Sequence, residues 1–287
     1  MKILVTGASG FLGRAVVEEL QETFRVAALG HQHAEGHIRS LDLRDAMAWR
    51  SELEEAAPDL VVHCAAYRDP DFCERYQEET RRLNITPLRV LADSLPPTAR
   101  VIFISTDYVF DGQNAPYREE SARHPINFYG QSKLEAEDIV LERAQSVVLR
   151  IPLLMGCGPT FNQSGLIAKM IQSVRSEELA ELDDRILRFP TDITDIARAI
   201  RFLIESNAAG IYHATQSEGK TQYGWAMTIA SLMGQAVDHI RPVDATETRI
   251  AARPLNSQLA MDRLQRVGFV PQNSFEHVAR KVLALES

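Results

Sequence analysis

The sequence has few lysines and few cysteines, and it has no long hydrophobic run. Five of its 31 basic residues are lysine and the formal net charge is -8, so no basic block is present that would follow a nucleic-acid backbone. The three cysteines, Cys64, Cys73 and Cys157, are odd in number and never spaced as Cys-x-x-Cys, which argues against a disulfide framework. No window approaches the roughly 18 apolar residues of a membrane span, and residues 1–7 are too short an apolar run for a signal peptide. We therefore expect a cytoplasmic protein with neither a nucleic-acid nor a membrane partner.

What the chain does contain is enough apolar residues, 45% of 287, to build a large core. Apolar runs alternate with helically spaced segments at residues 2–6, 25–29, 59–64, 101–104 and 146–150. This alternation predicts an α/β protein, a Rossmann-type doubly wound parallel sheet with helices on both faces. We assign residues 1–155 to this nucleotide-binding domain and 156–287 to a smaller, interwoven α/β substrate lobe. Parts of 186–215 are expected to pack on the first domain.

Helical spacing predicts one long helix over residues 71–95, with a kink at Pro87. Further helices and a short strand at 211–213 are expected in the second half of the chain. Those helices are expected over 162–178, 192–205, 221–233 and 274–285.

A glycine-rich turn follows the first strand. Gly7, Gly10 and Gly13 fall as Gly-x-x-Gly-x-x-Gly between a strand and a helix. Such a turn places backbone N–H groups and the positive end of the helix against a pyrophosphate. Its position at the start of an alternating chain predicts dinucleotide binding.

The second strand ends without the carboxylate that would bind the ribose 2′-hydroxyl of NAD. Residues 30–33, Gly-His-Gln-His, follow it and leave room for a 2′-phosphate accompanied by His31, His33 or Arg39. We therefore expect NADPH, with NADH as the alternative. Because His31, His33 and His37 have no cysteine or acid in matching register, we expect no metal site.

Two further stretches are placed to line a bound cofactor. Asp42 is placed to accept a hydrogen bond from the adenine edge, and its alternative role is that of a helix cap near Asp45. The third strand ends in Cys64-Ala65-Ala66, where small residues let the chain run close under a cofactor.

The stretch from 101 to 133 carries the predicted chemistry. A strand delivers Thr106, and Tyr129 and Lys133 lie four residues apart on one helix face. Hydride delivery to a carbonyl carbon leaves charge on the oxygen, so a proton donor, Tyr129, and an orienting hydroxyl, Thr106, must meet that oxygen. The Lys133 cation is expected to favour the Tyr129 phenolate. The pattern predicts a ketone reductase; the alternative is an ordinary helix start followed by a solvated lysine.

Together these motifs resemble the extended short-chain dehydrogenase/reductases, and specifically the dTDP-4-dehydrorhamnose reductase family. The matching stretches are Thr6-Gly7-x-x-Gly10-x-x-Gly13, residues 105–112, Tyr129-Gly130-x-x-Lys133, Leu149-Arg150 and Arg253-Pro254-x-Asn256-Ser257-x-Leu259. The resemblance implies NAD(P)H reduction of the 4-keto group of a nucleotide-linked 6-deoxysugar, with Thr106, Tyr129 and Lys133 as the catalytic residues. A homodimer is a further expectation.

The motifs and the resemblance together assign two sets of contacts. The cofactor set is Gly7, Ser9, Gly10, Phe11, Leu12, Gly13, His31, Asp42, Leu43, Cys64, Ala65, Ala66, Tyr129, Lys133 and Ile151. The substrate set is Tyr67, Asp107, Tyr108 and Arg253.

The same residues also resemble the regulatory β subunit of methionine adenosyltransferase, from the same branch. His63-Cys64-Ala65-Ala66, residues 116–120 and Arg188-Phe189-Pro190-Thr191 are closer to that relative. This implies an alternative function, an NADP-binding regulatory subunit with a protein partner. The chain ends at Ser287 without the extended tail that such a subunit would use for docking, so we favour the enzyme.

Two other enzyme classes share this branch. A nucleotide-sugar epimerase is the second alternative, disfavoured because epimerases tend to be longer in the substrate lobe. Dehydratases carry a glutamate where this chain has Tyr108, so dehydration is not expected.

Overall fold

The computed structural model describes residues 1–246 and 249–285. Its main sheet has seven strands in the order β10-β6-β5-β4-β1-β2-β3, and every pairing is parallel. These strands are β1 Lys2–Thr6, β2 Arg25–Gly30, β3 Ile38–Ser40, β4 Leu60–His63, β5 Arg100–Thr106, β6 Val147–Ile151 and β10 Gly210–His213. The predicted Rossmann-type fold is confirmed.

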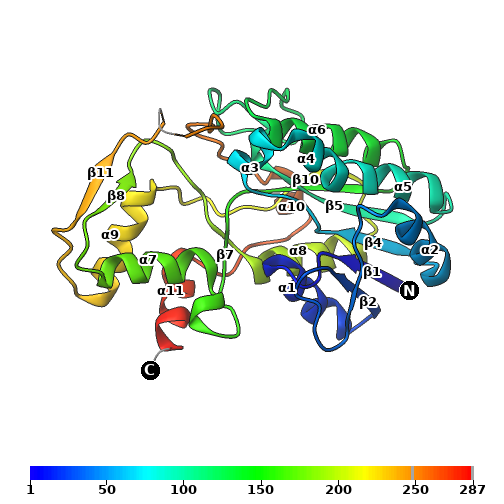
Figure 1. Ribbon diagram of the computed structural model, residues 1–287, viewed down its shortest axis with the longest axis horizontal. Helices are drawn as coiled ribbons and strands as arrows, with labels where there is room; N and C mark the ends of the chain where they lie inside the picture. Colours follow the sequence, from blue (N-terminus) through cyan, green and yellow to red (C-terminus); the bar gives the residue numbers. More distant parts are fainter. Residues whose placement is uncertain (247–248, 286–287) are drawn as a thin grey trace.

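Helices cover both faces of this sheet (Figure 1). One face carries α1 (Phe11–Gln21) and α8 (Ile193–Glu205), and the other carries α2 (Ala46–Ala56), α5 (Thr86–Ser94) and α6 (Phe128–Leu141). Because side chains alternate along a strand, Ile3 and Val5 pack toward α1 while Leu4 packs toward α2. Burial on both sides explains why the strands read as continuous apolar runs.

The prediction of one helix over 71–95 is wrong, because the structure has three helices there: α3 (Pro70–Arg75), α4 (Gln77–Asn84) and α5. The chain leaves helical geometry at Tyr76, where ψ is 62°, and Ile85, a turn residue with a φ of -119°, separates α4 from α5. Pro87 does not kink a helix. It lies in the first turn of α5, where its missing N–H costs no hydrogen bond.

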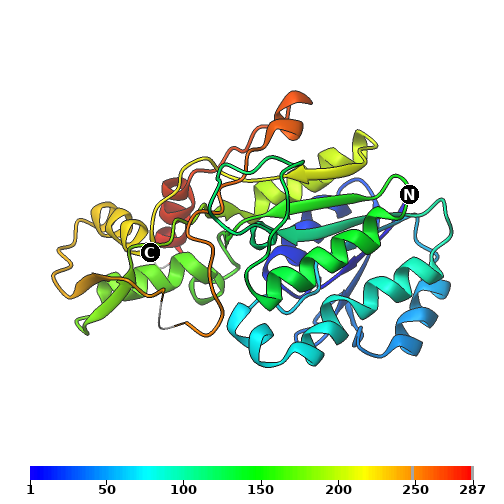
Figure 2. The ribbon, with the colours of Figure 1, turned by 90° about the horizontal axis from the view of Figure 1, so that it is seen from above.

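The later part of the chain builds a smaller lobe with its own core, at the left of Figure 1 and beside the sheet in Figure 2. Its helices are α7 (Gly165–Arg175), α9 (Gln222–Met233) and α11 (Phe275–Ala284), and its strands β8 (Ala180–Asp183) and β11 (Ile240–Val243) form a parallel pair. The helices predicted over 192–205, 221–233 and 274–285 are present as α8, α9 and α11. The helix predicted over 162–178 is shorter, because a 3-10 turn at Phe161–Gln163 precedes α7.

Short elements connect the two parts of the molecule. The strands β7 (Leu154–Met155) and β9 (Thr191–Asp192) pair with each other, and the helix α10 (Asp262–Arg266) packs on β10. Because β10 pairs with β6, a segment from beyond residue 155 completes the main sheet; the domain boundary itself stays a prediction. Among the described residues, no helix is long and apolar enough to cross a membrane.

Candidate active site

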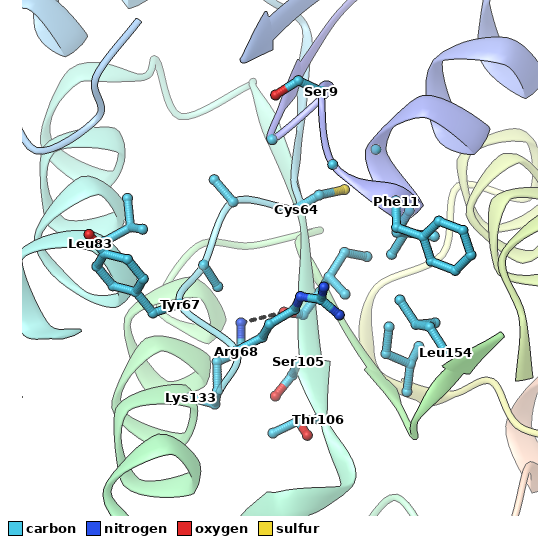
Figure 3. Close-up of a pocket in the computed structure, with 18 of the residues that line it drawn as sticks. Ser9, Phe11, Cys64, Tyr67, Arg68, Leu83, Ser105, Thr106, Lys133 and Leu154 are labelled. Carbon is cyan, nitrogen blue, oxygen red and sulfur yellow. Dashed lines mark hydrogen bonds between the residues drawn. The ribbon is translucent and has the colours of Figure 1, made fainter. Parts of the chain in front are cut away.

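A cavity of about 510 Å³ lies along the carboxyl ends of β1, β4, β5 and β6. Every residue in the predicted cofactor set lines it, and so does Thr106. From the predicted substrate set, Tyr67, Asp107 and Tyr108 line the cavity, whereas Arg253 does not. Figure 3 shows Ser9 at one end of the cavity and Thr106 at the other, with Lys133 and Arg68 between them.

The glycine-rich turn gives the cavity a surface of backbone N–H groups. Gly7 has a φ of +68°, and a Cβ there would lie 2.8 Å from the backbone nitrogen of Ala65, so the close approach to the end of β4 requires glycine. The helix α1 begins at Phe11, and its N-cap Gly10 offers no side chain to the first-turn amides. These amides and the positive helix end fit the diphosphate of a dinucleotide.

Asp42 and His31 both line the cavity, and Oδ2 of Asp42 lies 4.0 Å from Nε2 of His31. The guanidinium of Arg44 donates to Asp42, with 2.7 Å between Nη2 and Oδ2, and this contact lowers the pKa of Asp42 to about 2. The cap of α2 is Asp45, so the capping alternative for Asp42 is wrong. Arg39 pairs with Glu52 and is not part of the cavity lining, which removes it from the predicted phosphate contacts.

The predicted catalytic residues converge where β5 meets α6. Lys133 Nζ donates to the carbonyl oxygen of Ile104 at 2.6 Å (Figure 3), and it lies 4.0 Å from the ring centroid of Phe103. The Thr106 hydroxyl donates to Asp107 Oδ1 at 3.1 Å. Tyr129, one helical turn before Lys133, contacts Thr106, and its half-buried side chain lines the cavity.

Burial governs the protonation of this pair. It raises the pKa of Tyr129, and a hydrogen bond with Thr106 opposes that shift. Burial also lowers the pKa of Lys133 to about 7, with the charge of Glu137 opposing it. At neutral pH Tyr129 is therefore a phenol, and the expectation that Lys133 favours the Tyr129 phenolate stays a prediction. A phenol is the form that can donate a proton.

Two predicted substrate residues are already occupied by protein partners. Asp107 accepts hydrogen bonds from Thr106 and Ser257, and burial raises its pKa. Arg253 Nη1 lies 3.1 Å from Asp71 Oδ1, away from the cavity lining. Asp107 thus lines the cavity with both carboxylate oxygens already bonded to protein hydroxyls. Arg253 stays a predicted substrate contact, although it does not line the cavity.

Sequence reasoning missed three arginines that line the cavity, namely Arg44, Arg68 and Arg188. Arg188 lies with its guanidinium 5.6 Å from the ring centroid of Tyr108 and donates to the carbonyl oxygens of Leu187 and Pro254. Among the described residues, no carboxylate lies at ion-pair distance from it. In the sequence, Arg188 was noted only as part of the stretch 188–191, which resembles a family relative. That resemblance assigned no role to Arg188.

No group of three potential metal ligands lies together in the described ranges 1–246 and 249–285.

A family model, the RmlD substrate binding domain, matches residues 1–286. The chain belongs to the RmlD family. This confirms the resemblance, stated above, to the dTDP-4-dehydrorhamnose reductase family of short-chain dehydrogenase/reductases.

The curated relatives include both a regulatory subunit and a ketoreductase, the two alternatives that the sequence left open. The chain is 35% identical over 282 residues to methionine adenosyltransferase 2 subunit beta of Bos taurus, covering 96% of this chain and 84% of that protein. It is 34% identical over 289 residues to a probable dTDP-4,6-dihydroxy-2-methyloxan-3-one 4-ketoreductase of Streptomyces antibioticus, covering 98% and 94%.

Among solved structures, the chain resembles a dTDP-4-dehydrorhamnose reductase from Bacillus anthracis in complex with NADP. The TM-score is 0.85 at 26% identity, and the match covers 100% of this chain and 99% of that one. The family model and this structural likeness both support the RmlD-family fold, and the structural likeness supports a nicotinamide cofactor in general.

Proposed function

We propose that this protein is an NADPH-dependent reductase of the 4-keto group of a nucleotide-linked 6-deoxysugar. The observation that carries the proposal is that Thr106, Tyr129 and Lys133 line the same cavity as the glycine-rich turn. A proton donor, an orienting hydroxyl and an anion-binding turn are the groups that a carbonyl reduction by a dinucleotide requires. The name of the Streptomyces relative supports the substrate class.

The residues of the chain supply the proton side of this reaction. A bound nicotinamide would supply the hydride that reaches the carbonyl carbon. Tyr129, held as a phenol by burial, donates its proton to the carbonyl oxygen, which yields the alcohol and a tyrosinate. The Thr106 hydroxyl turns its hydrogen from Asp107 toward the same oxygen and orients it. The ammonium form of Lys133 stabilises the tyrosinate until solvent returns the proton.

The choice of NADPH rests on the residues that follow β2. His31, Gln32 and His33 line the cavity, and the nearby carboxylate of Asp42 is neutralised by Arg44. No carboxylate at the end of β2 therefore repels a 2′-phosphate. The Bacillus structure was solved with NADP. We also place the protein in the cytoplasm, where NADPH and nucleotide-linked sugars meet.

Arg188 supports a nucleotide-linked substrate. Within residues 1–246 and 249–285 it lines the cavity without a carboxylate partner, and such an arginine is suited to bind an anion such as the diphosphate of a nucleotide-sugar. Arg68, also exposed to the cavity, is a second cation in the same space.

The test is oxidation of NADPH by the purified protein when it is given a dTDP-4-keto-6-deoxysugar. A blank without sugar and a parallel assay with NADH accompany it. We expect sugar-dependent oxidation that is faster with NADPH. If the protein binds NADPH and never oxidises it, the reductase proposal is wrong.

The second candidate is an NADP-binding regulatory subunit, favoured by the 35% identity to methionine adenosyltransferase 2 subunit beta. Its test is co-elution with a methionine adenosyltransferase catalytic subunit and a change in that enzyme's rate. The same cavity would then hold NADP without turnover.

A further inference from the structure

Three consecutive residues of β5 each contact one residue of α6, and the α6 residues are spaced by four. The pairs are Ile104 with Lys133, Ser105 with Glu137, and Thr106 with Tyr129. Residues four apart lie on one helix face. One face of α6 therefore packs against the carboxyl end of β5 through all three contacts. Two of the three pairs contain the predicted catalytic residues, and the third contains Glu137.

Glu137 is fully buried, and its carboxylate is saturated with donors. Ser105 Oγ donates to Oε1 at 2.5 Å. Arg150 donates through Nε at 2.9 Å and through Nη2 at 2.7 Å, and Arg123 Nη1 donates at 3.2 Å. Arg123 also bonds Asp138 at the surface. The carboxylate is therefore fixed from β5, from β6 and from the segment before α6.

Arg150 links Glu137 to residues near the edge strand β10. It is 1% exposed, and its Nη1 donates to the carbonyl oxygen of Glu119 at 3.2 Å and lies 3.4 Å from Nε2 of His213. Arg150 and His213 are register partners on β6 and β10. Burial lowers the pKa of His213 to about 3, so this histidine is neutral and adds no charge.

The location of this ion pair is not explained by stability alone. A buried ion pair gains little over a well-packed apolar pair of the same volume, because two charges must be removed from water. The pair lies under the helix face that carries Tyr129 and Lys133, one helical turn beyond Lys133. Unlike an apolar pair, the Glu137–Arg150 ion pair holds a negative charge at a fixed position beneath these residues.

Glu137 is also the charged group that acts on Lys133. It raises the pKa of Lys133 against the effect of burial. The other titratable neighbours are neutral near pH 7, because burial raises the pKa of Cys64 to about 12 and of Cys73 to about 11 and lowers that of His63 to about 3.

We propose that Glu137, held by Arg150, is a positioning residue that fixes the helix face of Tyr129 and Lys133 against β5 and supplies the negative charge that favours the ammonium form of Lys133. The proposal rests on the reductase function for its effect on turnover. Its effect on Lys133 is independent of any ligand.

The test measures the protonation of Lys133 directly in the protein without cofactor or sugar. Trace labelling with acetic anhydride across pH, read peptide by peptide by mass spectrometry, reports the midpoint for each of the five lysines. The exposed Lys169 is the internal reference. We expect Glu137→Gln to move the Lys133 midpoint to lower pH by about one unit and to leave Lys169 unchanged.

The matched control is Glu135→Gln on the same helix, because Glu135 pairs with Arg81 and Arg89 at the surface. It is expected to leave the Lys133 midpoint in place. If Glu137→Gln does not fold, the double variant E137M/R150M replaces it, since an apolar pair of similar volume retains the fold; the same downward shift is expected.

An unchanged Lys133 midpoint in the folded variant would overturn the proposal, and a loss of unfolding stability alone would show a structural role. Where the wild-type protein reduces a keto-sugar, we also expect a fall of at least about tenfold in kcat for Glu137→Gln, with KM nearly unchanged. A wild-type protein without reductase activity would defeat the proposed function, yet the labelling result would still decide the role of Glu137.

Discussion

Lys133 donates a hydrogen bond to the carbonyl oxygen of Ile104 at 2.6 Å, two residues before Thr106 on the same strand. The contact ties the helix that carries Tyr129 to the strand that carries Thr106. It also places the amine of Lys133 where little water reaches it, because Lys133 lines the cavity but is only 3% exposed. This contact fixes the geometry of the site, but burying the charged form of Lys133 costs electrostatic free energy.

Replacing Tyr129 by phenylalanine should remove the proton donor and nothing else. We expect turnover to fall at least about 100-fold, while NADPH binding, measured by fluorescence titration, stays within about twofold of wild type. Tyr76→Phe is the control, because Tyr76 is an exposed tyrosine outside the cavity. Unchanged turnover in Tyr129→Phe would exclude Tyr129 from the catalytic role.

Replacing Lys133 by methionine should stabilise the fold in a pH-dependent way. The pKa of Lys133 is about 7 in the folded protein and about 10.4 in an unfolded chain. Between these values the unfolded chain binds more protons, so the penalty from Lys133 is complete below pH 7 and is lost as the pH rises toward 10. We expect Lys133→Met to be more stable at pH 7 by about 1–3 kcal/mol and to lose this advantage near pH 10. Urea unfolding at both pH values measures it, and an advantage that does not depend on pH would contradict the account.

Replacing Arg188 by glutamine should weaken binding of the sugar nucleotide. Losing a charged hydrogen-bond donor to a diphosphate is expected to raise KM about 10- to 100-fold and to leave NADPH affinity unchanged. Arg185→Gln is the matched control, because Arg185 is exposed and pairs with Asp244. Equal KM values for the two variants would exclude Arg188 from substrate binding.

Two glycines with the same backbone geometry should respond differently to alanine. Gly7 and Gly36 have φ values of +68° and +61°, but a Cβ at Gly7 meets the backbone of Ala65, whereas one at Gly36 meets nothing within 4 Å. We expect Gly36→Ala to cost about 1 kcal/mol of stability and to keep NADPH binding. Gly7→Ala should abolish binding. Calorimetric titration of both variants with NADPH measures the difference, and tight binding by Gly7→Ala would contradict the assigned role of the turn.

The main sheet could be predicted because its strands are buried on both faces and read as continuous apolar runs. Short strands gave no such signal: β3 has three residues, one half-buried and two exposed, and β11 contains a proline and two exposed residues. The breaks at Tyr76 and Ile85 were missed because both residues are acceptable in helices, and tertiary packing sets their backbone angles.

The cavity lining could be predicted where it depends on backbone position, as at Gly7, Cys64 and Thr106. The arginines in the lining could not be predicted, because their long side chains pair with residues that are distant in the sequence. Arg253 is drawn to Asp71, whereas Arg188 reaches the cavity. Local sequence does not contain either pairing.

The measurement that tests the central claim most directly is the mass of the sugar product formed with NADPH deuterated at C4 of the nicotinamide. If the protein reduces the keto group of a dTDP-4-keto-6-deoxysugar, the product gains one deuterium at C4 of the sugar, and Tyr129→Phe forms almost none. A protein that binds the deuterated cofactor tightly and returns the sugar unlabelled would contradict the reductase account and favour the regulatory alternative.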